Sequence, residues 1–524
     1  MTAVSRTLKL GDRTIPVILP DRRDARLHTA SVIISIHVIG IAALGFRVSM
    51  PQILAAIVTA GIIDVALTLR QTGKLVWPAS GMLTGSGVAL ILRLVGMDSG
   101  DYWSWAGWHW FALVAGFSIL TKYVIRFRGN HVFNPSNVGL VAAFLLIGAD
   151  VVEPLDFWWA PLGFWMILAY VLIIGGGVLI TRRLDLLEMA VTYWVVLTAG
   201  LAVLAASGHC MVAAWSPTPV CDGRFWTVLV TSPEILVFLF FMITDPKTIP
   251  SGRGARVVFA AGLGLLSVMM IAPHVTEYAA KVGLLASLTL WSPLRGLFDR
   301  ALPDAGGRRA GIATLWDRIG SRPLAGVFGR GLVIGVVLVA AVVGILVAGS
   351  PVRDQALALD RAAPEVSVEV DPASLPDVAV DESVHGLDVT VDDEFVDLLS
   401  LTLAENLAIE AEAMRTADGS LLAVSSGGTR LDEMQARLDT AVATGERVAD
   451  LFTFTEMAVA LHEPEGEGQT SAGLVFSTAG ELTRVLFDSS GEEVSRSSEP
   501  HRARFVVRQL AGDRWLLVEA EQGS

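Results

Sequence analysis

FFMITDPKTIPSGRGAR, residues 240–256, joins the end of one long apolar run to the start of the next. The first run stops at Thr244-Asp245-Pro246, a short cationic loop with Gly and Pro follows, and the next run begins at Val257. Backbone that leaves a helix at the edge of hydrocarbon is tolerated where protein buries it or where it lines a cavity. An acidic residue at such a break is a candidate functional residue. A second break, HVFNPSN at residues 131–137, precedes the apolar residues 138–147.

The composition is typical of a multi-pass membrane protein. Of 524 residues, 53% are hydrophobic and only 17% are charged, and the mean hydropathy is +0.57. Residues 351–524 contain 34 acidic and 12 basic side chains, which gives −22, whereas residues 1–350 contain 27 basic and 18 acidic, which gives +9. The chain therefore combines a basic membrane part with an acidic tail, and residues 1–27 do not read as a signal peptide.

Eleven apolar runs are long enough to predict membrane spans, since a span needs roughly 20 residues. The third, fifth and eighth are irregular because Pro and Gly interrupt or precede them, as in TSPE at residues 231–234. The runs lie at about 28–46, 50–69, 76–97, 107–124, 132–149, 157–181, 186–206, 225–244, 256–273, 278–298 and 330–349.

Positive charge predicts the orientation of these spans. With the N-terminus in the cytoplasm, nearly every Arg- or Lys-rich loop returns to the cytoplasm and the acidic loops lie outside. The plasma membrane is the predicted location, with the tail outside the cytoplasm. Cys210 and Cys221 share one predicted outer loop, where a disulfide would persist; two unrelated thiols are the alternative.

Spans 1–5 and 6–10 are predicted to form two halves. Each half has an interrupted third element, and interrupted segments at matching positions indicate inverted repeats around a site near the middle of the bilayer. Because the first half has an odd number of spans, five, the second half enters the membrane from the opposite side, as an inverted repeat requires. This prediction rests on topology, since the two halves show no residue-level repeat.

Three motifs carry a resemblance to a family. They are Thr84-Gly85, Phe133-Asn134-Pro135, and FFMITDP at residues 240–246, and over about residues 28–300 the chain resembles the NqrB/RnfD family of membrane flavoprotein subunits. It looks most like the stand-alone UnbU-type members from enediyne biosynthetic clusters. The resemblance implies a ten-helix core of two inverted five-helix repeats, similar to urea transporters, with a flavin in or beside the core. The cofactor-binding positions that it implies are Thr84, Gly85, Asn134, Pro135, Thr244, Asp245 and Lys247.

One departure from the family pattern concerns the flavin. NqrB and RnfD link FMN to the Thr of a Ser-Gly-Ala-Thr type sequence, which this chain lacks. The predicted cofactor is therefore noncovalent FMN or riboflavin. The two cysteines provide no iron–sulfur ligand set, and the lone His131 and His274 have no second ligand at metal spacing.

Each polar candidate also has a structural interpretation. For Asp245, the functional interpretation is that it accepts hydrogen bonds from a flavin or binds a cation, and the structural one is that it only ends a helix. For Lys247, the functional interpretation is that it neutralises a ligand phosphate, and the structural one is that it is an ordinary cytoplasmic cation. Asn134 caps a half-helix that faces a ligand, or it forms a turn. Glu234 and Asp64, inside apolar runs, are candidates for an ion or proton relay or for silent ion pairs.

The chain changes character after residue 300. Residues 301–329 form a cytoplasmic Arg/Gly-rich loop, 330–349 an eleventh anchor helix, 350–386 an acidic linker, and 387–524 an extracytoplasmic α+β domain. That domain is predicted to contain helices at 392–413 and 430–443 and then strands at 448–462, 470–478, 481–488 and 503–520. Helices followed by a curled sheet weakly resemble the nuclear transport factor 2 fold, which implies a binding module for a partner protein. Its acidity argues against nucleic acid.

Three functions fit this sequence. The first is transmembrane electron transfer through a noncovalent flavin. In that case the expected partners are the lipid bilayer and other membrane electron-transfer subunits. The second is transport of an ion or small solute through the inverted-repeat core. The third is a membrane scaffold that presents the C-terminal domain to a partner outside the cytoplasm.

Overall fold

A computed structural model gives the structure of the chain, and it divides into two compact units. One unit contains residues 1–209 and 221–350, and the other contains residues 210–220 and 351–524. The structure describes residues 3–10, 13–22, 24–97, 100–155, 162–213, 215–216, 218–302, 327–353, 370–386, 393–462, 472–488, 491–509 and 515–522. The predicted loop at 301–329 lies mostly outside these residues.

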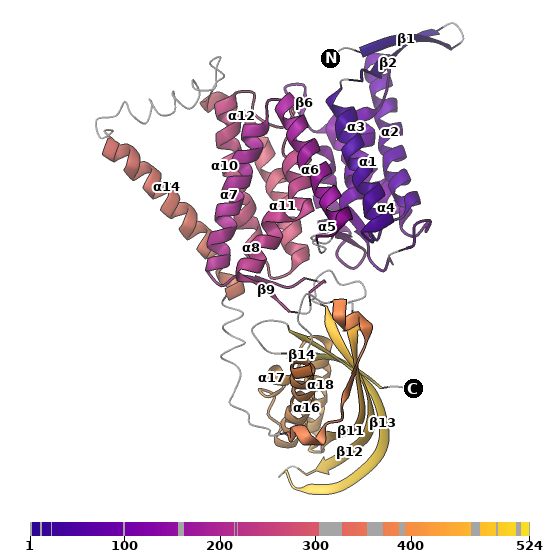
Figure 1. The fold of residues 1–524 in the computed structure, drawn as a ribbon, viewed down its shortest axis with the longest axis vertical. Helices are drawn as coiled ribbons and strands as arrows, with labels where there is room; N and C mark the ends of the chain where they lie inside the picture. The colour runs from indigo at the N-terminus through magenta and orange to yellow at the C-terminus, as the bar shows by residue number, and fades with distance from the viewer. Residues whose placement is uncertain are drawn as a thin grey trace. The chain divides into compact units, whose positions relative to one another are not determined.

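The first unit is mainly helical (Figure 1). Within the part of the chain that the structure describes, five helices are long and apolar enough to cross a bilayer: α1 (Ala25–Ala43), α2 (Met50–Thr72), α6 (Phe164–Arg183), α7 (Leu187–Ala206) and α10 (Arg253–Ile271). A bent pair, Asp222–Thr231 with Pro233–Met242, makes a sixth if it is one span. Further described helices of this unit are α3 (Ala79–Ile91), α4 (Trp108–Val124), α5 (Pro135–Leu146), α11 (Glu277–Trp291), α12 (Arg295–Ala301) and α14 (Val327–Ala348).

The third and fifth predicted spans are short helices completed by extended chain. α3 and α5 contain 13 and 12 residues, and each is followed by a strand, β4 (Leu92–Leu94) and β7 (Val152–Pro154). The two strands pair antiparallel, with Arg93 opposite Glu153. The pairing provides hydrogen bonds for backbone N–H and C=O groups of the two segments where each leaves its helix. Backbone groups within a bilayer need such partners.

Proline and serine shape the eighth predicted span. α8 (Asp222–Thr231) ends before Ser232, whose hydroxyl accepts a hydrogen bond from the Ile235 amide and so caps α9 (Pro233–Val237). A π-helical turn, η1 (Phe238–Met242), completes the segment, which bends by 40° at the break. Proline removes a backbone donor there, so the helix cannot continue unbroken.

Glycine allows α3 to pack directly on the backbone of α2. A Cβ atom added at Gly85 would lie 2.4 Å from the Ala56 carbonyl oxygen, and one added at Gly81 would lie 2.7 Å from the Ala60 carbonyl oxygen. Contacts of this kind are common between membrane helices, where small residues let backbones approach. Gly85 of the Thr84-Gly85 motif is therefore a packing residue between α2 and α3.

Short strands outside the helices also pair with one another. β1 (Ala3–Leu10) and β2 (Arg13–Pro20) form a hairpin, and β2 pairs in parallel with β3 (Leu75–Val76). The hairpin lies in residues 1–27, for which the sequence predicts no strand. Strand β8 (Cys210–Met211) pairs with β9 (Val220–Cys221), and both cysteines are disulfide-bonded in the structure.

The second unit packs three helices on a five-stranded sheet (Figure 1). The helices are α16 (Asp393–Thr416), α17 (Leu422–Ser425) and α18 (Gly428–Thr444), and the sheet order is β10-β11-β12-β13-β14. The strands are β10 (Val378–Val380), β11 (Arg447–His462), β12 (Gly473–Phe487), β13 (Glu493–Gln509) and β14 (Trp515–Gln522). Leu403, Leu407, Phe476, Phe505 and Leu517 lie in the core between α16 and the sheet.

The predicted helices of this domain are confirmed, whereas its strands differ in extent. β12 continues through Gly480, where the sequence analysis placed a break, because the backbone pairs on both sides of that glycine. β13 begins ten residues earlier than predicted, and Glu493–Pro500 are all exposed, so they carry no apolar alternation. The predicted acidic linker also contributes β10, which pairs in parallel with β11.

Candidate functional site

Two of the three family-like motifs meet at one place, which we call the motif junction: His131, Asn134, Met242 and Asp245. Asn134 caps α5, because its Oδ1 accepts from the Asn137 amide at 3.4 Å, and its Nδ2 donates to the Met242 carbonyl at 3.0 Å. His131 Nε2 lies 2.8 Å from Asp245 Oδ2. A carboxylate only accepts, so the imidazole N–H donates in this bond. The two breaks are thus bound to each other although 108 and 114 residues separate the partners.

Asp245 is held as a carboxylate at the motif junction. Burial raises the pKa of Asp245, but the hydrogen bond and charge of His131 and the amide of Lys247 outweigh it and hold that pKa below its ordinary value. One fifth of the Asp245 side chain remains exposed. The Lys247 side chain is exposed, and its ammonium forms no hydrogen bond or ion pair with any described residue.

The other implied cofactor positions are engaged within the protein. The Thr244 hydroxyl donates to the Phe240 carbonyl at 2.5 Å, and the Thr84 hydroxyl donates to the Ser80 carbonyl at 3.0 Å. Pro135 is buried at the first turn of α5. A Cβ atom at Gly87 would lie 3.3 Å from the Ser136 hydroxyl, which itself donates to Asn134 Oδ1 at 2.9 Å. The helix that carries the first motif therefore also reaches the motif junction.

Asp64 is at the centre of a second cluster, the Asp64 network: Asp64, Ser80, Gly81, Lys122 and Tyr123. Lys122 Nζ and the Tyr123 hydroxyl lie 2.8 and 2.5 Å from Asp64 Oδ1, and the Gly81 amide donates to Oδ2 at 3.1 Å. Lys122 also donates to the Ser80 hydroxyl at 3.0 Å. This carboxylate thus lies at the start of α3, where the helix dipole favours negative charge.

A hydroxyl continues the Asp64 network along α2. Tyr123 already donates to Asp64, so the Thr68 hydroxyl, 2.8 Å from the Tyr123 oxygen, is the donor in their contact. The resulting series runs from Thr68 through Tyr123 and Asp64 to Lys122. Ordered hydroxyls and an acid–base pair can exchange protons, a property of relays in membrane proteins.

Two further buried ion pairs, the ladder ion pairs, lie beside the β4–β7 strands. Arg93 pairs with Glu153 at 2.5 Å, and their side chains are 8% and 7% exposed. Lys281 pairs with Glu277 at 2.6 Å, and its ammonium also donates to the Leu155 carbonyl. Pairing is the condition under which charges persist in such an environment.

Sequence reasoning missed both partners in each ladder ion pair and the partners of Asp64. Lys122 lies in the last turn of α4 and is buried, so it is not one of the exposed cations of a cytoplasmic loop. Glu277 and Lys281 are four residues apart on one helix, which is a signal for an ion pair that the sequence carried. Arg93 inside an apolar run was the other available signal.

The remaining candidates are placed as follows. Glu234 lies in the first turn of α9, directly after the break at Ser232. Among the residues that the structure describes, no three His, Cys, Asp or Glu side chains come together as metal ligands. His274 lies between α10 and α11.

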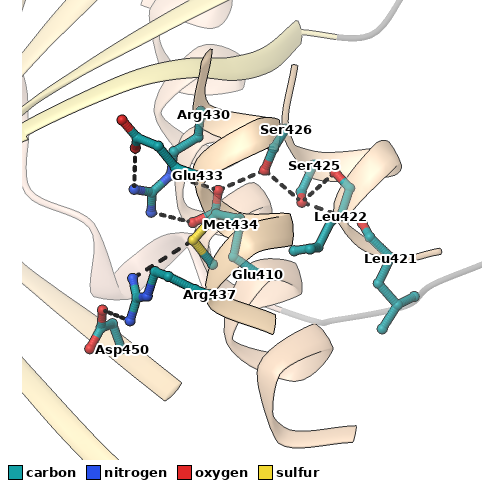
Figure 2. A network of polar contacts seen from close by, with 10 residues as sticks. All are labelled: Glu410, Leu421, Leu422, Ser425, Ser426, Arg430, Glu433, Met434, Arg437 and Asp450. Carbon is teal, nitrogen blue, oxygen red and sulfur yellow. Dashed lines mark hydrogen bonds and ion pairs between the residues drawn. The ribbon is translucent and has the colours of Figure 1, made fainter. Parts of the chain in front are cut away.

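In the C-terminal domain a buried carboxylate joins the three helices, and Figure 2 shows this Glu410 network: Glu410, Ser425, Ser426 and Arg430. Arg430 donates to both Glu410 oxygens, at 3.0 and 2.6 Å, and the Ser426 hydroxyl donates to Oε1 at 2.6 Å. Ser425 lies 3.2 Å from Ser426. Glu433 only approaches Arg430, at 3.8 Å, and is 61% exposed.

A pocket of about 240 Å³ lies between α16, β11 and the chain that precedes β10. Its walls are mainly apolar, and Asp450 is the charged residue among them. Arg437 donates to Asp450 Oδ2 at 3.0 Å, as Figure 2 shows. The lining residues are Val370, Ser374, Leu375, Ala404, Leu407, Ala408, Asp450, Leu451, Phe452, Thr453 and Phe454.

Comparison with known proteins assigns no family, because neither the family models nor the curated proteins that were searched match this chain.

Proposed function

We propose that the helical unit is an NqrB/RnfD-like subunit that transfers electrons across the membrane with a noncovalently bound flavin, FMN or riboflavin, near the motif junction. A bound flavin would supply one- and two-electron redox chemistry. Five candidate spans, or six, support the membrane placement. The N-terminus in the cytoplasm and the C-terminal domain outside it remain part of the proposal, on the evidence of loop charge.

The observation that carries the proposal is that two of the motifs meet and that the helix of the third, α3, reaches the same place. Gly87 of α3 lies against Ser136, Ser136 bonds Asn134, and Asn134 bonds the Met242 carbonyl. These residues come from three helices that are distant in the sequence. Their meeting is what the family resemblance implies for a shared site.

Part of the implied residue set fits a flavin and part does not. The exposed Lys247 ammonium fits a phosphate, and the Asp245 carboxylate, one fifth exposed, fits an N–H donor such as the ring imide of a flavin. Gly85 does not fit, because the backbone of α2 already occupies the space beside it. The proposed site is therefore at the loop end of the motif junction, beside Asp245 and Lys247.

The packing of the helices supports two inverted halves. In the first half α2 contacts α3 and α4, and α4 contacts α5; in the second α7 contacts α8 and α10, and α10 contacts α11. The equivalent elements α1 and α6 contact each other, as do α5 and α11. Contacts between equivalent elements are expected beside a pseudo-two-fold axis.

An absorption spectrum of the detergent-purified protein, followed by ultraviolet imaging of a denaturing gel, tests the flavin. The proposal predicts a flavin band that is lost from the denatured chain, and lower flavin occupancy in Asp245→Asn and Asn134→Ala. Arg253→Ala, at the start of α10 and paired with Asp185, is the control and should keep its flavin. A protein that stays colourless after incubation with FMN and riboflavin would refute the proposal.

Ion or solute translocation is the second candidate function, and the buried ion pairs favour it. The Asp64 network and the ladder ion pairs place six charged side chains, all at most 10% exposed, inside the helical unit. Such residues mark ion and proton pathways in membrane proteins. A proton or sodium flux into liposomes that carry flavin-free protein, abolished by Asp64→Asn, would support this function over the first.

For the C-terminal domain we propose a nuclear transport factor 2-like binding module that docks a partner protein. The pocket beside Phe452 and Phe454 supports a site for an apolar group of that partner. Cross-linking of the full chain through a reactive group placed at Ala408 tests this, with exposed Ala436 on α18 as the matched position. Equal cross-linking from both positions would contradict it.

A further inference from the structure

His37 is the one polar residue among those that α1 buries, and none of the functions proposed above uses it. The residue is 6% exposed, whereas the next one, Val38, is 60% exposed, so the imidazole points into the protein and not toward lipid. α1 packs on α3 and on α6. An ionisable residue on the inner face of a span is a candidate functional residue, so the partners of its two ring nitrogens decide what it can do.

One nitrogen of His37 has a clear partner. Its Nδ1 atom lies 2.9 Å from the carbonyl oxygen of Ile33, one turn earlier in α1. A carbonyl only accepts, so Nδ1 must carry a proton to form this hydrogen bond. In a neutral imidazole the other nitrogen, Nε2, then has no proton and can only accept. Nε2 is buried, and it forms no hydrogen bond with any residue that the structure describes.

The Nε2 atom faces the carbonyl of Ala89, a buried residue in the last turn of α3. In a helix that continued, this carbonyl would accept from the amide of Arg93, four residues later. Arg93 lies in strand β4 instead, so the carbonyl lacks that partner, as carbonyls at helix ends do. A bare nitrogen and a carbonyl oxygen therefore face each other. Both can only accept, and burying acceptors without a donor is unfavourable.

We propose that His37 is a proton-binding site at the contact between α1 and α3. The imidazolium donates from Nδ1 to the Ile33 carbonyl and from Nε2 to the Ala89 carbonyl. Only this form satisfies both carbonyls, because each neutral tautomer leaves one ring nitrogen without a proton opposite an acceptor. The C-terminal end of a helix also carries partial negative charge, which favours a cation beside the last turn of α3. The proton, taken from solvent, adds one hydrogen bond between the two helices and breaks none.

The surroundings of His37 leave the two carbonyls as its polar partners. Among the described residues no charged side chain acts on the imidazole. α3 contains no titratable residue, and on α6 the Tyr170 hydroxyl donates to the Thr231 carbonyl. The other titratable groups on the elements around this contact are Arg26 and His28 at the start of α1, Arg182 and Arg183 at the end of α6, and the Arg93–Glu153 pair that follows α3.

The proton site acts on a helix that the proposed functions use. α3 also reaches the motif junction, where Gly87 lies against Ser136. The added bond from His37 holds the other end of the same helix, so acidification would tie α3 more firmly to α1. The inference does not depend on the flavin and is tested on flavin-free protein, so the two proposals can fail separately.

Nitrogen NMR of the full-length protein with 15N-labelled histidine, in lipid vesicles, tests the site. Spectra are recorded at about pH 8 and about pH 5, the range over which histidine changes its charge. The signals of His37 are those that disappear in His37→Gln, and His37→Phe provides the same assignment if glutamine disturbs the fold. We expect one bare and one protonated ring nitrogen at the higher pH. At the lower pH the signal of the bare nitrogen should be lost, and both N–H protons should exchange slowly with water because both are buried and bonded.

His109 is the matched control, because it is exposed at the start of α4. Its ring should also become charged at the lower pH, but its N–H protons should exchange rapidly with water. His109→Gln should leave the signals of His37 unchanged. A His37 ring that keeps its bare nitrogen when His109 is fully charged would overturn the proposal. So would a charged His37 whose N–H protons exchange as rapidly as those of His109, because the two carbonyls would then not be its partners.

Discussion

The Asp64 network and the Glu410 network are nearly equal in burial but differ in chemistry. In the first, Lys122 and Asp64 are 10% and 8% exposed; in the second, Arg430 and Glu410 are 11% and 4% exposed. Each carboxylate also accepts a hydroxyl, from Tyr123 at 2.5 Å and from Ser426 at 2.6 Å. Burial alone therefore does not distinguish a functional site from a structural one.

The basic partner makes the difference. Arg430 binds Glu410 through two parallel hydrogen bonds, and a guanidinium stays protonated in proteins, so this pair is a fixed clamp between α16 and α18. Lysine is a single point charge that loses its proton more readily when buried. With Tyr123 and Thr68 in series, the Asp64 network is the candidate for the proposed ion or proton translocation, whereas the Glu410 network joins helices of the C-terminal domain.

The largest effect is expected in the clamp. Glu410→Ala leaves Arg430 buried without its partner and should destabilise the C-terminal domain by about 3–5 kcal/mol. Limited proteolysis of the full chain in increasing urea measures this. Glu433→Ala, which removes the exposed acid beside the same Arg430, should change stability by less than about 0.5 kcal/mol. Similar losses in both variants would show that Glu410 is not the principal partner.

A double-mutant cycle tests the Asp64 network. Lys122→Gln leaves the Asp64 carboxylate uncompensated and should destabilise the helical unit by about 2–4 kcal/mol, since breaking a buried pair exposes the full penalty of the remaining charge. Adding Asp64→Asn to the Lys122→Gln protein should restore about 1–3 kcal/mol of the lost stability, as measured by thermal unfolding in detergent. Additive losses would mean that the two residues do not form an effective pair.

Packing between α2 and α3 gives a smaller effect. Gly85→Ala places a Cβ against the Ala56 carbonyl, which is backbone and cannot rotate away, and should cost about 1–3 kcal/mol. Gly175→Ala is the control, because a Cβ there meets nothing within 4 Å. That substitution should be neutral or stabilise by up to about 1 kcal/mol. A destabilised control with an unaffected Gly85→Ala would contradict the described packing.

Acidification should produce the smallest effect, at the motif junction. Because the folded-state pKa of Asp245 is held low, its carboxylate contributes stability above the unfolded pKa of about 4 and loses it as the pH falls through the folded pKa. Between pH 5 and the pH at which Asp245 is fully protonated, the free energy of unfolding of the wild type should fall by about 1 kcal/mol more than that of Asp245→Asn. Unfolding is followed by tryptophan fluorescence. Parallel acid curves for the two proteins would argue against this assignment.

The sequence predicted the features that depend on local pattern. Apolar length located the helices, Asn134-Pro135 and Thr244-Asp245-Pro246 located the breaks, and helical spacing located α16 and α18. It did not predict that Asn134 would bond the end of η1, because that contact depends on how distant helices pack. The family resemblance brought the two motifs into one hypothesis, and the geometry gives them a common location.

Strand limits and charge partners were harder to predict for physical reasons. β13 begins in a stretch that is exposed on both faces, so burial imposes no alternation there. Lys122 and Asp64 are 58 residues apart, and each alone has an ordinary interpretation. Only the close packing of α2, α3 and α4 makes them a pair.

Electron transfer in sealed proteoliposomes tests the central claim most directly. Ferricyanide is trapped inside, and a membrane-impermeant reductant is added outside to vesicles that carry flavin-loaded wild type, flavin-free wild type or Asp245→Asn. The proposed function predicts rapid loss of ferricyanide absorbance only with the flavin-loaded wild type, and a rate near that of empty vesicles for the other two. If flavin-loaded protein reduces ferricyanide no faster than empty vesicles, the helical unit does not transfer electrons across the membrane, and ion translocation becomes the better account of its buried charges.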